Sequence, residues 1–220
     1  LNKQENARID FDSGEISKLI INGIEKKNAE IIAGSLQISK SDLQLGENEI
    51  IVVYSKSFSR NGTGLHRFID PEDNSVYFYT QFEAYHANKV FPCFDQPDIK
   101  ADFMMNVKVP KDFIVKSATS PIVKSEGEFQ IFEFPKSKIF STYLFSIIAG
   151  PYAEWKSSYK NIPLGLYVRR SMAKYVLPDE WFLITKQGFQ FFEDYFDISY
   201  PFDKYDQMIV PEFNAGAMEN

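Results

Sequence analysis

The sequence predicts a mostly β protein, in which an antiparallel sandwich or saddle of β-sheets precedes the first strand, helix and strand of an α/β domain. Over the first 150 residues, short runs of β-branched and aromatic residues alternate with turn residues. A helical period appears only after Pro178, between two strand-like stretches. We expect a β domain over residues 1–155 and the beginning of an α/β domain over residues 156–220.

Four stretches carry the β signal most clearly. "EISKLIING" ends on Asn22-Gly23, a dipeptide that favours tight hairpins, and "EIIVVYSKSFS" is rich in β-branched and aromatic residues. "EFQIFEF" and "STYLFSIIAG" continue the pattern towards Gly150. The even spacing of such short strands is typical of antiparallel sheets.

The second domain is predicted from three successive stretches. "IPLGLYVRRS" reads as a strand, and "DKYDQMIVPEFNAGAMEN" at the end of the chain looks extended. Between them, Pro178 suits the first position of a helix, and Asp179 and Glu180 suit its first turn. One face of that helix carries four aromatic side chains: Phe182, Phe189, Phe192 and Phe196.

Composition and charge exclude several classes of protein. Hydrophobic residues make up 44% of the chain and aromatic residues 16%, which indicates a globular protein with an ample core. A formal charge of -6 disfavours nucleic acid as a partner. Cys93 is the only cysteine, which favours a reducing compartment, and we expect a cytoplasmic location. No apolar run approaches the roughly 20 residues of a membrane segment.

The stretch "YFYTQFE" is the first candidate site. If it is a strand throughout, alternation places Gln81 and Glu83 on one face, in line with Tyr79. A carboxamide beside a carboxylate can accept several hydrogen bonds, which suits an ammonium group. The alternative is a solvated strand face with an incidental glutamate.

Two further features are interpreted as structural. In "FPCFDQPD", two prolines flank an aspartate that can cap its own turn, which indicates a corner with Cys93 as a small apolar residue rather than a nucleophile. His66 and His86 are interpreted as turn or packing residues. The sequence has no His-Glu-x-x-His, and we predict no metal site within it.

The final stretch "NAGAMEN" is the second candidate site. Gly216 and Ala217 are small enough for an extended peptide to approach and form main-chain hydrogen bonds, and Glu219 could hold a positive group at the end of that peptide. The alternative is an ordinary glycine-containing loop.

Together these blocks resemble the zinc aminopeptidases of the aminopeptidase N family, the gluzincin aminopeptidases. "GLHRFIDPEDNSVYFYTQFEAYHANKVFPCFDQPDIKADF", "GPYAEW" and "PFDKYDQMIVPEFNAGAMEN" match the family in order and separation, and "GAMEN" is its full exopeptidase signature. The resemblance implies a saddle-like N-terminal domain followed by a thermolysin-like catalytic domain. It also implies an enzyme that hydrolyses single amino acids from the free N-terminus of peptides.

The resemblance assigns roles to seven residues. Gly216 and Ala217 would bind the substrate main chain. Glu219 would hold the α-ammonium, assisted by Glu83. Met218 and Gln81 would lie near the pocket for the first side chain, and Asn220 completes the signature as a substrate-binding residue.

The same resemblance implies what the 220 residues lack. The family's zinc ligands, general base and oxyanion-stabilising Tyr would all fall beyond Asn220. We therefore expect no catalytic residue and no bound zinc in this stretch, and as partners peptides with a free N-terminus and the remainder of the catalytic domain. The alternative is a non-catalytic β-sheet binding or interaction module related to the family; the helix after Pro178 disfavours it, because a complete β module needs no α/β unit.

Overall fold

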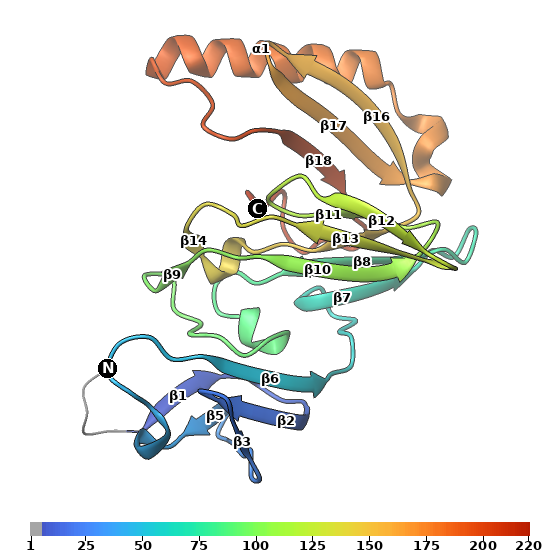
Figure 1. Ribbon diagram of the computed structural model, residues 1–220. Coiled ribbons are helices and arrows are strands. Elements are labelled where there is room, and N and C mark those ends of the chain that lie inside the picture. Colours follow the sequence, from blue (N-terminus) through green and yellow to red (C-terminus); the bar gives the residue numbers. More distant parts are fainter. Residues whose placement is uncertain (1–5) are drawn as a thin grey trace.

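The structure, a computed structural model, describes residues 6–220 and consists mainly of antiparallel sheets arranged in three tiers (Figure 1). The prediction of a mostly β fold with one helix after the sheets is confirmed. The first five residues of the predicted N-terminal domain lie outside the described residues.

The lower tier contains two three-stranded sheets, ordered β1-β5-β4 and β3-β2-β6. Its elements are β1 (Ala7–Asp10), β2 (Glu15–Ile21), β3 (Ile24–Lys26), β4 (Ile31–Ile32), β5 (Ser35–Ile38), the 3-10 turn η1 (Lys40–Asp42) and β6 (Ile50–Ser55). The predicted turn at Asn22-Gly23 joins β2 to β3, and both residues adopt positive φ, 51° and 78°. A two-residue hairpin turn of type I′ requires a positive φ at both central positions.

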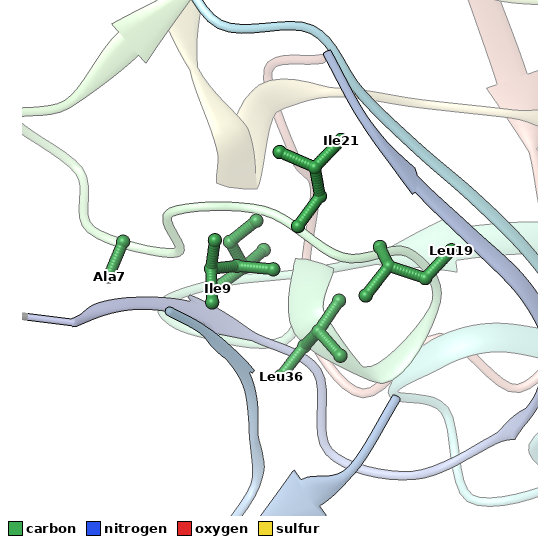
Figure 2. Close-up of a cluster of buried hydrophobic side chains, with 6 residues drawn as sticks. Ala7, Ile9, Leu19, Ile21 and Leu36 are labelled. Atoms are coloured by element: carbon green, nitrogen blue, oxygen red, sulfur yellow. The ribbon is translucent and has the colours of Figure 1, made fainter. Parts of the chain in front are cut away.

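Apolar side chains from both sheets form the core of the lower tier (Figure 2). Leu19 and Ile21 lie two residues apart on β2, and Leu36 and Ile38 occupy the same relation on β5, so alternation directs each pair to the buried face. Ile9 of β1 completes the contact. Each buried Leu or Ile stabilises the fold by about 1.5–3 kcal/mol relative to an exposed one.

The middle tier contains sheets ordered β11-β15-β8-β7, β10-β13-β12 and β14-β9. Its strands are β7 (Gly64–Ile69), β8 (Val76–Gln81), β9 (Lys100–Ala101), β10 (Met105–Pro110), β11 (Ile114–Lys116), β12 (Ile122–Glu126), β13 (Phe129–Phe134), β14 (Phe140–Ser141) and β15 (Ile148–Gly150). Two 3-10 turns complete it, η2 (Ala87–Lys89) and η3 (Thr142–Leu144).

The stretch "FPCFDQPD" links the lower and middle tiers, so its interpretation as a structural corner is confirmed. The main chain of Cys93 exchanges two hydrogen bonds with Asp10, of 2.8 and 3.0 Å. Asp95 does not cap its own turn: its buried carboxylate accepts from the amide of Asn88 at 2.9 Å and the hydroxyl of Thr142 at 2.9 Å. Burial, with Asp95 and Asp10 nearby, raises the pKa of the Cys93 thiol well above its usual value.

The upper tier is a three-stranded sheet with one helix on its face (Figure 1). Its elements are β16 (Tyr152–Tyr159), β17 (Ile162–Arg169), the 3-10 turn η4 (Arg170–Tyr175), α1 (Pro178–Phe196) and β18 (Tyr205–Ile209). The predicted strand, helix and strand are β17, α1 and β18, and the two strands are parallel, which requires the crossover that α1 supplies. Residue 155 lies inside β16, which pairs with β17 along its whole length; the position of the domain boundary stays a prediction.

Helix α1 begins at Pro178, as predicted, and the aromatic face predicted for it is covered only in part. Phe182 is buried against the sheet, and Phe189 packs against Tyr159 and other tyrosine rings. Phe192 and Phe196 remain 56% and 59% exposed and line an open apolar groove of about 930 Å³.

A buried carboxylate holds the upper tier to the middle tier. Asp70, in the turn between β7 and β8, is 1% exposed. Its Oδ2 accepts from Arg169 Nη1 at 3.0 Å and from the Ser171 hydroxyl at 2.6 Å, and its Oδ1 accepts from the amide of Glu72 at 3.0 Å. Burial would raise the pKa of Asp70, but these hydrogen bonds and the charge of Arg169 outweigh it and hold the pKa below its usual value.

A second set of charges, around Lys116, lies at the same junction. Lys116 of β11 lies 4.3 Å from the centre of the Tyr167 ring and 3.9 Å from both Glu154 and Asp206. Lys204 donates to the main-chain carbonyl of Ser117 at 2.8 Å. Polar contacts therefore join the two tiers at two places.

Replacing Arg169 by Met should destabilise the chain by about 3 kcal/mol at neutral pH, because Asp70 is left buried and charged without its cation. The folded-state pKa of Asp70 is lowered, so the stability that it contributes is present above its unfolded value and lost as pH falls through the folded value. The difference between wild type and variant should therefore shrink in acid.

Urea unfolding at pH 7 and pH 3 measures both effects. Lys174→Met is the matched control, because Lys174 pairs with Glu72 at 3.1 Å on the surface and should change stability by less than about 1 kcal/mol. Equal losses of unfolding free energy in the two variants would show that the buried Asp70–Arg169 pair contributes no more to stability than the surface pair.

Candidate functional site

The first predicted site segment follows the end of β8. The expectation of a continuous strand through Glu83 is wrong, because β8 ends at Gln81. Its partner β7 begins at Gly64, which lies opposite Gln81, so β7 has no residue that could pair with Phe82 or Glu83. Phe82 is fully buried, whereas the Glu83 side chain is exposed. Alternation along a strand therefore does not relate Gln81 to Glu83.

A hydrogen bond relates these two residues instead. The buried Gln81 side chain accepts from the amide of Glu83 through Oε1 at 3.2 Å. This contact fixes the turn that presents the Glu83 carboxylate to solvent. The carboxamide and the carboxylate thus lie at the same end of β8.

The second predicted segment follows β18. The expectation that it is extended to the end of the chain is wrong directly after β18, because residues 211–216 form a turn and bends; residues 217–220 have no strand pairing. Glu212 adopts the left-handed region, with φ 52°, and this turns the chain away from the sheet. The signature residues Gly216, Ala217, Glu219 and Asn220 are exposed, and Met218 is partly buried.

Hydrogen bonds at both ends of this segment bring it to the middle tier. The Tyr79 hydroxyl donates to the main-chain carbonyl of Glu212 at 3.0 Å, and Asn220 Nδ2 donates to the carbonyl of Leu144 at 3.3 Å. Tyr79 precedes Gln81 by two residues on β8, so the segment and Gln81 belong to the same region. Figure 1 shows the C-terminus between the upper and middle tiers.

The Tyr79 hydroxyl remains a hydrogen-bond donor over the whole neutral range. Burial, together with the charge of Glu212, raises the pKa of Tyr79 to about 12. Sequence reasoning placed Tyr79 in line with Gln81 but missed its contact with Glu212, and no local pattern signals a contact between residues so far apart.

The two histidines do not form a metal site. His66 is buried on β7, where its Nδ1 accepts from the amide of Gly62 at 3.0 Å, and His86 precedes η2 in a turn. The interpretation of both as packing or turn residues is confirmed. Within residues 6–220, no group of three or more His, Cys, Asp or Glu side chains could hold a metal, so the described residues do not fit a zinc centre.

Over the same range, no helix combines the length with the apolar character that a bilayer span requires.

Comparison with known proteins gives consistent matches. The family profile of the peptidase M1 N-terminal domain matches residues 6–144, and that of the peptidase family M1 domain matches residues 182–220. Aminopeptidase N of Streptomyces lividans is 40% identical over 217 residues, which cover 96% of this chain and 25% of that protein.

Two archaeal relatives agree with these matches. The probable aminopeptidase 2 of Sulfurisphaera tokodaii is 37% identical over 68% of this chain and 19% of its own length. The tricorn protease-interacting factor F2 of Thermoplasma acidophilum is 37% identical over 64% of this chain and 18% of its own length. The chain spans about a quarter or less of the length of these relatives. Since the first profile alone covers more than half of the sequence, the chain belongs to peptidase family M1.

Proposed function

We propose that this chain supplies the recognition part of a metallo-aminopeptidase that removes single residues from peptides with a free N-terminus, as in peptide catabolism. The observation that carries the proposal is that the chain is bound to the middle tier on both sides of the "GAMEN" segment. Tyr79 of β8 bonds to Glu212, four residues before that segment, and Asn220 at its end bonds to Leu144 of η3. On this proposal, carboxylates from two distant parts of the chain would act in one region.

Glu219 and Glu83 are proposed to accept hydrogen bonds from the substrate α-ammonium. Both side chains are exposed, so a peptide can reach them. An ammonium carries three donors and is well satisfied by two carboxylates with one further acceptor. Gln81, which fixes the turn that carries Glu83, would assist.

The other signature residues are proposed to bind the substrate beyond its amine. A Cβ added at Gly216 would meet no atom within 4 Å, so a peptide main chain can approach Gly216 and Ala217 closely. Met218 and Gln81 would border the pocket for the first side chain. Asn220, through its bond to Leu144, would fix the far end of the segment.

The remainder of the enzyme is proposed to complete the site. Zinc and the hydrolytic groups would come from residues outside these 220, since the described part holds no ligand set for zinc. The rest of the catalytic domain would cover the apolar groove beside α1 and pair with β18, which is an edge strand here. We further propose a cytoplasmic location, because the sequence carries a single cysteine.

Glu219→Ala in the full-length enzyme should lower kcat/KM for free peptides by roughly ten- to several-hundred-fold, and Glu83→Ala somewhat less. Charge-assisted hydrogen bonds of this kind contribute roughly 1.5–3 kcal/mol each, and about 1.4 kcal/mol corresponds to a factor of ten. Zinc content should not change. Cleavage of N-acetylated peptides, which lack the ammonium, is the control; equal losses on free and acetylated peptides would contradict the proposal.

The 220-residue chain alone should neither bind zinc in a stoichiometric site of submicromolar affinity nor hydrolyse aminoacyl arylamides, because it lacks a ligand set. Calorimetric titration and an arylamidase assay measure this. Metal-dependent turnover by a pure preparation would overturn the assignment of the hydrolytic groups to other residues. A complete reading frame without His-Glu-x-x-His would instead support the alternative, a non-catalytic β-sheet binding module.

A further inference from the structure

Tyr79 contacts the chain at the point where it turns towards the signature segment. The Tyr79 side chain is 1% exposed, and its hydroxyl donates to the carbonyl of Glu212 at 3.0 Å. Its ring meets the ring of Phe213 edge-on, with centroids 5.7 Å apart. Glu212 has φ 52°, a conformation that residues other than glycine rarely adopt without support from their surroundings. The Tyr79 hydroxyl supplies such support at that residue.

His66 approaches the same glutamate from the neighbouring strand. It lies opposite Tyr79 in the β7–β8 ladder, with ring centroids 4.9 Å apart. Because Nδ1 accepts from the amide of Gly62, the neutral ring carries its proton on Nε2. This buried nitrogen makes no hydrogen bond within the described part of the chain, and Glu212 Oε2 lies 3.3 Å from it. The pair is an electrostatic contact rather than a well-formed hydrogen bond.

The turn before β7 contacts Asn214, two residues after Glu212. Asn214 Nδ2 donates to the carbonyl of Asn61 at 3.0 Å. A Cβ added at Gly62 would lie 2.2 Å from the same nitrogen, and Gly62 has φ 78°. The positive φ therefore favours glycine at this position, and a Cβ there would displace the side chain of Asn214.

Three consecutive residues, 212–214, are thus held by β7, β8 and the turn that precedes them. β18 ends at Ile209, so strand pairing in the upper tier does not determine the course of the chain beyond it. We propose that Tyr79 and His66 are positioning residues: they clamp Glu212 and thereby set the place of the substrate-recognition segment 215–220 relative to Gln81 and Glu83. This inference rests on the proposed function of that segment.

The test compares Tyr79→Phe with Tyr77→Phe in the full-length enzyme. Both residues are fully buried tyrosines on β8, but the Tyr77 hydroxyl accepts from the amide of Arg170 at 3.1 Å and does not contact the segment. Tyr79→Phe removes one hydrogen bond to the clamp, and we expect KM for a free dipeptide arylamide to rise about three- to tenfold with kcat nearly unchanged. Tyr77→Phe should leave KM unchanged, although it lowers stability.

A second measurement reports on the geometry without relying on activity. Hydrogen exchange, followed by mass spectrometry in a peptide covering residues 210–220, should accelerate in Tyr79→Phe and not in Tyr77→Phe. His66→Gln retains an N–H donor and should retain more protection in this peptide than His66→Leu.

The outcomes separate the clamp from the proposed function. If Tyr79→Phe changes neither KM nor exchange while Glu219→Ala abolishes activity on free peptides, the clamp is wrong and the function stands. If exchange accelerates but Glu219→Ala has no effect, the proposed function fails, and the recognition role of the clamp fails with it. Equal increases in KM for Tyr77→Phe and Tyr79→Phe would indicate general destabilisation and overturn the positioning role.

Discussion

The arrangement of the molecule depends on the row of tyrosine hydroxyls that β8 presents to the upper tier. Tyr77 accepts from the amide of Arg170, and Tyr79 donates to the carbonyl of Glu212. β8 pairs with β7 on one edge and β15 on the other, so its backbone is fixed from both sides. Burial raises the pKa of both tyrosines, which keeps the hydroxyls neutral and able to donate. The start of η4 and the turn after β18 are therefore both hydrogen-bonded to the same strand, β8.

The candidate site is a continuation of that row. Gln81 follows Tyr77 and Tyr79 at the same period of two, and it stands where the ladder with β7 ends. Beyond this point no strand pairing constrains the chain, so it can turn. In this turn the Gln81 carboxamide accepts a hydrogen bond from the amide of Glu83. A rigid strand thus ends in a short exposed turn, which is an arrangement suited to presenting a carboxylate at a defined place.

Local signals in the sequence predicted the elements, and distant contacts determined the rest. The Asn22-Gly23 hairpin and the start of α1 at Pro178 are encoded within a few residues, and the structure confirms both. The end of β8 depends on where β7 begins, and the turn at Glu212 depends on Tyr79, 133 residues away. The periodicity of a sequence carries no information on such contacts. For this reason the sequence predicts too long a strand at both site segments. The site residues themselves came from the family resemblance, and their roles stay predictions.

The two faces of the upper tier differ in a way that bears on the site. Towards the middle tier it combines the buried rings of Tyr77, Tyr152 and Tyr167 with ion pairs, Asp70 with Arg169 and Lys116 with Asp206. On the side of α1, Phe192 and Phe196 line an open apolar groove. Ion pairs and hydrogen bonds from tyrosine hydroxyls fix the relative orientation of the groups that they join, whereas apolar contacts depend little on orientation. The ion pairs and hydroxyl groups of this junction can therefore fix the segment that follows β18 relative to β8, independently of whatever covers the groove.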